Sequence, residues 1–301
     1  MKDKFLRNIN YMRISITDRC NMRCNYCMPG GIKNFSMNDE ILTYEEILEI
    51  AKAAVNCGIV NFKITGGEPL VRRGAVDLIS RLKNISGVQK VTLTTNGALL
   101  SNFIHELKNA GLDGVNISLD SLEPKNFEKI TGFNFLEKVL EGIDAAISSG
   151  IKTKINTVLQ KGINEDEWEN ILEFAKNNPV HVRFIELMPI GEGKNFHGVK
   201  NSDLLKKIQK KYKNIENDFI SHGSGPAVYI KIPSFIGGVG FISAVCGKFC
   251  ASCNRLRLTA NGRLKPCLSF ADYVDIKEIF ENVNENERQK FLENAIKKAM
   301  V

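Results

Sequence analysis

Two sets of three cysteines are the most reactive side chains of this sequence. They are Cys20, Cys24 and Cys27, and Cys250, Cys253 and Cys267. Structural zinc sites generally use four protein ligands, whereas a cubane iron–sulfur cluster held by three thiolates leaves one iron open. We therefore interpret each set as the ligands of a 4Fe–4S cluster that can bind a further small ligand. The alternatives are a zinc loop completed by a distant cysteine and, for the second set, a zinc knuckle with Cys246 as its fourth ligand.

Several polar and glycine-rich motifs come directly after apolar, β-branched runs that we interpret as strands. They are Gly66-Gly67-Glu68-Pro69 and the segments 94–97, 118–121 and 186–189, and the first cysteine set follows a strand in the same way. In barrels of parallel strands, the carboxyl ends of the strands form the rim on which active sites are built. We therefore expect these motifs to meet at one end of the sheet.

Four basic side chains lie where a positive charge needs a partner. Arg255 and Arg257 are two residues apart in a predicted strand, so both point to one face beside Cys253. Arg13 and Lys154 lie inside other predicted strands, where an inward-pointing charge is costly without a counter-charge. Arginine binds phosphate with two parallel hydrogen bonds, so this set fits a triphosphate. For Arg255 and Arg257 the alternative is an exposed surface hairpin.

The periodicity of the chain predicts the elements that position these residues. Apolar runs alternate with helical patterns, which is typical of repeated βα units and a parallel sheet. The predicted strands are 13–17, 61–65, 90–95, 114–119, 152–159 and 181–187, and the predicted helices include 43–57, 99–110 and 164–177. Because a closed barrel uses eight units, six predict an α/β fold with an incomplete (β/α)6 TIM-type barrel.

The pattern changes after about residue 191. A lysine-rich helix over 202–212 is followed by short strands near 227–232 and 240–245, by a hairpin of 255–259 and 263–266 around Asn261-Gly262, and by a helix over 287–300. We predict a barrel domain over residues 1–191. A C-terminal β-rich extension over residues 192–301 carries the second iron–sulfur cluster. The lysines of 206–213 are interpreted as a solvated helix face rather than an anion-binding patch.

Composition limits the classes of protein that fit. The 301 residues are 43% hydrophobic and 25% charged, which is an ordinary globular balance. No segment approaches the roughly 18 apolar residues of a membrane span, so we expect a cytoplasmic protein with reduced thiols and no membrane partner. The net charge of +7 suits a phosphorylated small molecule, and we expect no nucleic-acid partner. The four histidines form no recognisable catalytic motif, so cofactors must carry the difficult step.

The spacing of Cys20, Cys24 and Cys27 resembles the defining motif of the radical S-adenosylmethionine (radical SAM) enzymes, and Gly66-Gly67-Glu68-Pro69 resembles their GGEP motif. The resemblance implies the same incomplete (β/α)6 barrel. It also implies that S-adenosylmethionine chelates the open iron of the first cluster. Reductive cleavage of this cofactor would then release a 5′-deoxyadenosyl radical.

Four further segments, 13–21, 115–122, 183–189 and 249–268, resemble the GTP 3′,8-cyclase family of molybdenum cofactor biosynthesis. The resemblance implies that GTP is converted to (8S)-3′,8-cyclo-7,8-dihydroguanosine 5′-triphosphate, with the guanine edge held by the second cluster. The implied cofactors are S-adenosylmethionine and two 4Fe–4S clusters, whose ligands are the six cysteines named above. The other implied site residues are Tyr26, Gly67, Ser118 and Met188 for S-adenosylmethionine, and Arg13, Lys63, Thr94, Lys154, Arg255, Leu256 and Arg257 for GTP, with Arg255 and Arg257 also assigned as catalytic.

The sequence departs from that family in two places. Lys63 stands where the family commonly has arginine, which keeps the charge but loses the guanidinium fork. The chain also ends Lys297-Lys-Ala-Met-Val301, where the family usually has a Gly-Gly tail, so we expect a weak cyclisation step. Cys57 and Cys246 have no counterpart in the family motifs, and we interpret Cys57 as packed within a helix.

By the same resemblance, the expected partners are GTP, an electron donor such as flavodoxin or ferredoxin, a downstream cyclic pyranopterin monophosphate synthase and a second copy in a homodimer. Two other functions remain open. A radical SAM peptide-modifying enzyme with an auxiliary iron–sulfur cluster gives no reason for the basic residues within the strands. An iron–sulfur electron carrier or zinc-stabilised binding module gives no reason for the glycine-rich rim.

Overall fold

The computed structural model describes residues 7–30, 40–220, 222–247 and 249–300. Within these ranges, twelve strands form one sheet in the order β12-β11-β10-β1-β2-β3-β4-β5-β6-β9-β8-β7. The central parallel strands are β1 (Tyr11–Ser15), β2 (Asn61–Thr65), β3 (Lys90–Thr95), β4 (Gly114–Ser118), β5 (Thr153–Thr157) and β6 (His181–Ile185). The helices between them are α1 (Tyr44–Asn56), α2 (Ala75–Lys83), α3 (Leu100–Asn109), α4 (Pro124–Thr131), α5 (Leu136–Ser149) and α6 (Trp168–Asn177).

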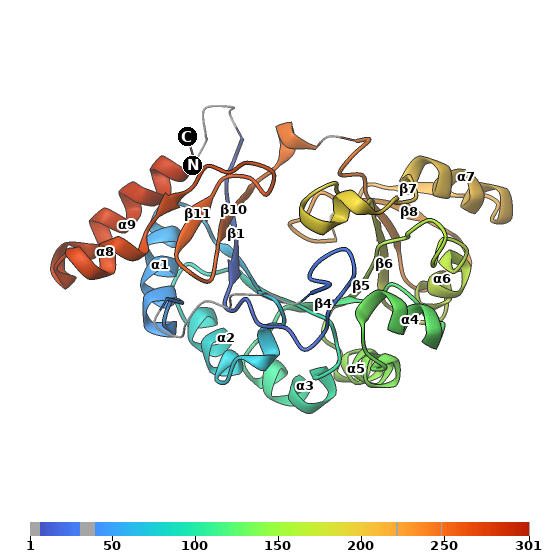
Figure 1. Ribbon diagram of the computed structural model, residues 1–301, viewed down its shortest axis with the longest axis horizontal. Coiled ribbons are helices and arrows are strands. Elements are labelled where there is room, and N and C mark those ends of the chain that lie inside the picture. Colours follow the sequence, from blue (N-terminus) through green and yellow to red (C-terminus); the bar gives the residue numbers. More distant parts are fainter. Residues whose placement is uncertain (1–6, 31–39, 221, 248, 301) are drawn as a thin grey trace.

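The sheet curves so that its strands surround a concave face, and the helices cover the convex face (Figure 1). The strand sequences explain this arrangement because apolar residues alternate with polar ones. Met12 and Ile14 of β1, and Phe62 and Ile64 of β2, are fully buried in the core between sheet and helices. The residues between them therefore point to the concave face, which is where the charged positions of the strands lie.

The C-terminal strands extend this sheet at both edges. On one side β9 (Val239–Ile242) pairs in parallel with β6 and is followed outward by antiparallel β8 (Val228–Lys231) and β7 (Glu216–Asp218). On the other side β10 (Arg255–Leu258) pairs in parallel with β1, and β11 (Arg263–Lys265) and β12 (Val274–Asp275) follow it. The β-rich region is therefore continuous with the sheet of the first half of the chain.

Local sequence signals explain several element boundaries. The Thr43 hydroxyl accepts from the Glu46 amide and the Glu46 carboxylate accepts from the Thr43 amide, so α1 begins with the predicted capping box. The predicted helix over 164–177 begins only at Trp168. Asn164 accepts from the Gln160 amide and donates to the Asp120 carbonyl, so its side chain ties a loop to the sheet instead of capping a helix.

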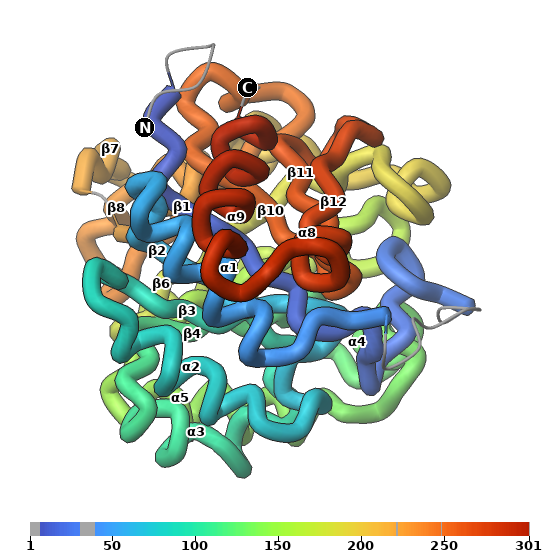
Figure 2. The backbone as a smooth tube through the Cα atoms, turned by 90° about the vertical axis from the view of Figure 1, so that its left-hand side faces the viewer, coloured from blue at the N-terminus to red at the C-terminus, as the bar shows by residue number. Residues whose placement is uncertain are grey.

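Three helices complete the C-terminal part: α7 (Asn201–Lys211), α8 (Lys277–Asn282) and α9 (Glu285–Met300). Helix α9 packs against α1, which lies far from it in sequence (Figure 2). Arg288 forms an ion pair with Glu49 at 3.2 Å, and Asn56 donates to Glu293 at 2.8 Å. Lysines of α7 lie on an exposed face and pair with acidic residues near α6, as predicted for a solvated helix. No helix in the described part of the chain has the length and apolar character needed to cross a bilayer.

Candidate functional site

The first cysteine loop follows β1 and is held against the glycine turn that follows β2. The Gly67 amide donates to the Thr17 carbonyl, and the Glu68 amide donates to the Arg19 carbonyl, both at 2.8 Å. A Cβ at Gly67 would lie 2.3 Å from the Arg19 carbonyl oxygen. Only glycine therefore allows these two backbone segments to approach so closely. The Gly-Gly turn fixes the position of the loop that carries Cys20.

Glu68 joins the glycine turn to the end of β3. Its fully buried carboxylate accepts from the Thr95 hydroxyl at 2.8 Å, the Asn96 amide at 2.7 Å and the Leu70 amide at 3.0 Å. Burial raises the pKa of Glu68 to about 7, although these hydrogen bonds favour its charged form. The Asn96 side chain in turn lies 3.8 Å from the Cys20 sulfur. The ends of β1, β2 and β3 thus form one connected rim.

Tyr26 links the same cysteine loop to the end of β4. Its hydroxyl donates to Asp120 at 2.7 Å, and Asp120 also accepts from the Val158 amide at 2.8 Å. Burial raises the pKa of Asp120 to about 6 and, with the nearby carboxylate, raises that of Tyr26 well above its usual value. Tyr26 is therefore a hydrogen-bond donor that fixes the loop. Ser118 ends β4 and Met188 follows β6, so the sequence-predicted residues for S-adenosylmethionine lie around one rim.

The thiols of the first set are free, and their environment suits a metal cluster. Burial raises the pKa of Cys20, Cys24 and Cys27, and for Cys24 the negative charges of Asp120 and of the other two thiolates raise it further. Burial therefore favours the neutral thiols, and a nearby positive charge such as a metal cluster would favour their ionised form. Among the described residues no three His, Cys, Asp or Glu side chains surround a single-ion site. A cubane places its thiolates on separate irons, so its three cysteines need not converge on one ion.

The second cysteine set lies at the opposite end of the strands. Cys253 precedes β10, whose first residue pairs with Tyr11 at the start of β1, and Cys267 follows antiparallel β11. Both cysteines therefore lie at the amino ends of the parallel strands, whereas the first set follows their carboxyl ends. Burial alone would raise the pKa of Cys253, but the neighbouring Arg255 guanidinium lowers it below its usual value. This electropositive setting favours a thiolate ligand.

Cys246 has a different environment from the second set. Its amide and that of Val245 donate to the buried Glu186 carboxylate at 3.0 and 2.9 Å. Glu186 follows β6, so Cys246 is held near the carboxyl ends of the strands rather than near Cys253. Cys57 is buried at the end of α1, as predicted, with its sulfur 3.7 Å from the Glu293 carbonyl oxygen.

Between the two cysteine sets, the concave face carries a cluster of six basic side chains, which we call the basic cluster. Its members are Arg13, Lys63, Lys154, Arg183, Arg255 and Arg257. Arg13 is in register with Lys63 on one neighbouring strand and with Arg257 on the other. In the part of the chain that the structure describes, no ion pair joins any member to a carboxylate. The Nε atoms of Arg13, Arg183 and Arg255 are buried without a hydrogen-bond partner.

The electrostatics of the basic cluster show that it is arranged for an anion. Burial and then the neighbouring cations lower the pKa of Lys154 to about 8, that of Arg257 to about 10, and that of Lys63 well below its usual value. Arg13 and Arg183 are shifted in the same direction. Like charges gathered without counter-charges destabilise the fold, and a bound polyanion would remove that cost.

The sequence reasoning did not select Arg183 or Asn116. Arg183 is only 8% exposed, and its Nη2 donates to Asn116 Oδ1 at 2.8 Å. The Asn116 amide nitrogen lies 3.3 Å from the Thr94 hydroxyl, so the three side chains connect β6, β4 and β3. The strand alternation that selected Arg13 and Lys154 applies equally to Arg183, because Val182 and Phe184 beside it are fully apolar and buried.

Leu256 is placed differently from its neighbours in β10. Its side chain is 1% exposed and belongs to the helix-side core, whereas Arg255 and Arg257 point to the concave face. Only the backbone of Leu256 can therefore contact a ligand on the concave face.

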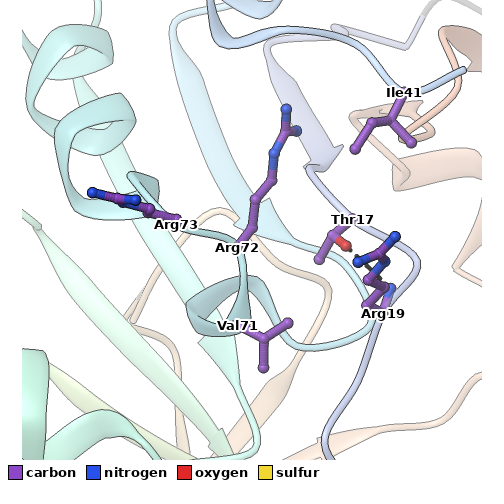
Figure 3. Close-up of a pocket in the computed structure, with 6 residues that line it drawn as sticks. All are labelled: Thr17, Arg19, Ile41, Val71, Arg72 and Arg73. Atoms are coloured by element: carbon purple, nitrogen blue, oxygen red, sulfur yellow. Dashed lines mark hydrogen bonds between the residues drawn. The ribbon is translucent and has the colours of Figure 1, made fainter. Parts of the chain in front are cut away.

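A separate cavity of about 290 Å³ opens beside the first cysteine loop (Figure 3). It is lined by Thr17, Arg19, Ile41, Val71, Arg72 and Arg73. Arg72 is already used there, because it donates to the Ile16 and Leu42 carbonyls and stacks on Tyr44 at 4.2 Å. No member of the basic cluster lines this cavity, so it is not part of the concave-face site.

Comparison with known proteins identifies the class to which this fold and site belong. Residues 14–175 match the radical SAM superfamily, so the chain is a radical SAM protein. Residues 180–301 match the Molybdenum Cofactor Synthesis C family. The chain is 43% identical over 297 residues to a GTP 3′,8-cyclase of Clostridium perfringens, covering 98% of this chain and 92% of that protein. It is 46% identical over 286 residues to one of Thermodesulfovibrio yellowstonii, covering 94% and 88%. The chain belongs to the GTP 3′,8-cyclase family.

Solved structures share the fold at low sequence identity. Streptococcus suis SuiB bound to S-adenosylmethionine superposes with a TM-score of 0.65 at 16% identity, covering 93% of this chain and 63% of SuiB. The native enzyme anSMEcpe with bound AdoMet gives a TM-score of 0.58 at 17% identity, covering 94% of this chain and 83% of that one. At this identity the likeness establishes the fold alone: a radical SAM α/β fold with a parallel sheet and a C-terminal β-rich region.

Proposed function

We propose that the chain binds GTP along the concave face of its sheet and converts it to 3′,8-cyclo-7,8-dihydroguanosine 5′-triphosphate in molybdenum cofactor biosynthesis. The observation that carries this proposal is the basic cluster between the two cysteine sets. Six cations that pair with no carboxylate among the described residues match a triphosphate with roughly four negative charges. Family membership supports the same substrate, because the similar proteins are named GTP 3′,8-cyclases.

The cofactors are S-adenosylmethionine and two 4Fe–4S clusters. We propose Cys20, Cys24 and Cys27 as ligands of the first cluster, and Cys250, Cys253 and Cys267 as ligands of the second. When bound at these cysteines, the cofactors would supply radical chemistry at C3′ of GTP and a Lewis acid for the guanine base. Tyr26, Gly67, Ser118 and Met188 lie around the rim and would contact S-adenosylmethionine.

The protein's own residues would position the substrate. Arg13, Lys63, Lys154, Arg255 and Arg257 would bind the triphosphate, and the unpaired Nε atoms support that role for both Arg13 and Arg255. The backbone at Leu256 and the Thr94 hydroxyl would make further contacts. A five-residue strand such as β1 is about 16 Å long. GTP could therefore extend along the strands from one cysteine set toward the other, which orients C3′ relative to C8 and keeps water away.

Finer features of the fold and its partners belong to the same proposal. We infer that β1 to β6 with their helices form an incomplete (β/α)6 barrel over residues 1–191, and that residues 192–301 form the region carrying the second cluster. An electron donor such as flavodoxin or ferredoxin would supply reductant. A cyclic pyranopterin monophosphate synthase would take the product, and a second copy would form a homodimer in the cytoplasm.

A deuterium-transfer assay tests the proposal. The clusters are reconstituted without oxygen, and reductant, S-adenosylmethionine and GTP deuterated at C3′ are added. Deuterium in the 5′-deoxyadenosine product, detected by mass spectrometry, is the expected result. Unlabelled 5′-deoxyadenosine would refute C3′ of GTP as the target and favour peptide modification. No 5′-deoxyadenosine would mean that the first cysteine set does not hold an active cluster.

A further inference from the structure

Asn116 connects two side chains that approach the concave face from different strands. Its Oδ1 atom accepts from Arg183 Nη2 at 2.8 Å, and its Nδ2 atom lies 3.3 Å from Thr94 Oγ1. Asn116 is 5% exposed, and both ends of its amide are satisfied within the site. Arg183 crosses β5 to reach it, because β4 and β6 are not neighbours in the sheet.

Arg183 fixes the direction of the hydrogen bonds that join it through Asn116 to Thr94. A guanidinium can only donate, so the Asn116 oxygen must face Arg183 and its amino group must face Thr94. The amino group then donates to Thr94 Oγ1. The Thr94 oxygen accepts this hydrogen bond with one of its two lone pairs, so its own proton points to a different acceptor. Asn116 thereby makes Thr94 a donor toward a ligand.

The same contact orients Arg183. The Tyr229 hydroxyl is the other side-chain partner of its guanidinium, and the buried Nε atom has none. The contacts with Asn116 and Tyr229 fix the orientation of the guanidinium, and its Nε–H is one donor left for a ligand. The buried Nε donor has no hydrogen-bond partner among the described residues, and an anion on the concave face would satisfy it.

We propose that Asn116 is a positioning residue for the nucleotide, which orients both the Arg183 guanidinium and the Thr94 hydroxyl toward it. This proposal rests on the proposed function, because it assumes that GTP occupies the concave face. Asn116 is buried, and its amide oxygen and nitrogen each bond to one of these neighbours, so it acts on the nucleotide through them. Its effect therefore depends on Thr94, which distinguishes positioning from a direct contact with GTP.

The test measures GTP binding by calorimetry to the anaerobically reconstituted holoenzyme in the absence of reductant. The variants are Asn116→Ala, Thr94→Val and their double mutant. Asn116→Asp is added because it keeps the size and the bond to Arg183. An ionised aspartate can only accept hydrogen bonds, so the Thr94 hydroxyl would donate to it. The direction of the hydrogen bond between residues 94 and 116 is then reversed. Asn126→Ala serves as the matched control, since Asn126 is hydrogen-bonded to Glu167 on the helix side.

Both Asn116 variants are expected to weaken GTP binding by about tenfold or more. Asn116→Ala loses both orienting contacts, whereas Asn116→Asp keeps the bond to Arg183 and turns the Thr94 hydroxyl away from the nucleotide. In turnover, Asn116→Asp should raise KM for GTP more than it lowers kcat. The iron content of the Asn116 variants and their affinity for S-adenosylmethionine should match the wild type. The GTP affinity of the control Asn126→Ala should also match the wild type. The double mutant should lose clearly less GTP affinity than the product of the two single fold-losses predicts. Both substitutions break the same hydrogen-bond network, so their effects overlap.

Two results would overturn the inference while leaving the proposed function intact. One is a wild-type GTP affinity in Asn116→Asp. The other is a double mutant whose fold-loss of GTP affinity equals the product of the Asn116→Ala and Thr94→Val losses. Failure of the wild-type holoenzyme itself to bind GTP would overturn the proposed function and, with it, the role of Asn116. If Asn116→Ala loses iron or melts early, Asn116→Asp and Thr94→Val decide the question alone.

Discussion

The buried carboxyl group of Glu68 makes the stability of the rim depend on pH. Burial raises its pKa from the usual 4.5 to about 7. The folded state therefore binds this proton more tightly than the unfolded state does. The stability that Glu68 contributes is fully present below pH 4.5 and is lost as pH rises through 7. Between pH 5 and pH 8 this loss amounts to about 2.5 kcal/mol, at about 1.4 kcal/mol for each tenfold change in proton affinity.

The perturbation that isolates this effect is Glu68→Gln. Glutamine resembles the protonated acid: its oxygen can still accept from Leu70 and Thr95, while its amino group faces the Asn96 amide as the carboxyl proton would. The pH dependence of all other groups cancels when wild type and variant are compared. The free energy of unfolding of wild type minus that of Glu68→Gln should fall by about 2.5 kcal/mol from pH 5 to pH 8.

Urea unfolding of the cluster-free, reduced chain at several pH values measures this difference. Glu137→Gln on the exposed face of α5 is the control, and its difference from wild type should stay flat. A difference for Glu68→Gln that is constant within about 0.5 kcal/mol from pH 5 to pH 8 would refute the reasoning. It would mean that the three hydrogen bonds outweigh burial and keep the carboxyl at its ordinary pKa.

Three further outcomes are expected. Gly67→Ala should lose the iron of the first cluster, because its Cβ would meet the Arg19 carbonyl oxygen at 2.3 Å; iron analysis showing both clusters intact would contradict this. Cys246→Ala should keep full iron content while Cys253→Ala loses the second cluster, and iron loss in Cys246→Ala would disprove our ligand assignment. GTP affinity should fall as pH rises from 7 to 9, since Lys154 with its pKa of about 8 loses its charge, and Lys154→Arg should flatten that profile; an unchanged profile in Lys154→Arg would assign the titration elsewhere.

Local sequence patterns predicted the elements whose boundaries depend on nearby residues. Strands β2 and β3 have the predicted bounds, and α1 begins at its capping box. Asn261-Gly262 lies at the turn between β10 and β11, which pair antiparallel as predicted. In each case the short-range preference of the sequence agrees with the tertiary structure. Periodicity and turn chemistry are therefore sufficient to predict these element boundaries.

The pairing of distant strands could not be predicted in the same way. The periodicity of β9 and β10 indicates strands but not their partners, and the structure places them in parallel beside β6 and β1. The side chain of Asn164 bonds to the sheet rather than capping a helix, which local propensity cannot distinguish. Strand alternation could have selected Arg183, whereas the role of Asn116 became visible only when the structure placed it between Arg183 and Thr94.

The parallel pairing of β10 with β1 has a consequence for synthesis of the chain on the ribosome. Asn10 and Asn254, which are hydrogen-bonded beside these strands, lie 244 residues apart in sequence. At about 5–20 residues per second, translation needs on the order of tens of seconds to supply that partner. Throughout this interval β1 lacks one neighbour and the concave face lacks Arg255 and Arg257. The nascent chain therefore exposes an unpaired strand edge until translation is nearly finished, and the faster the chain is elongated, the shorter the time in which this edge can pair with another chain.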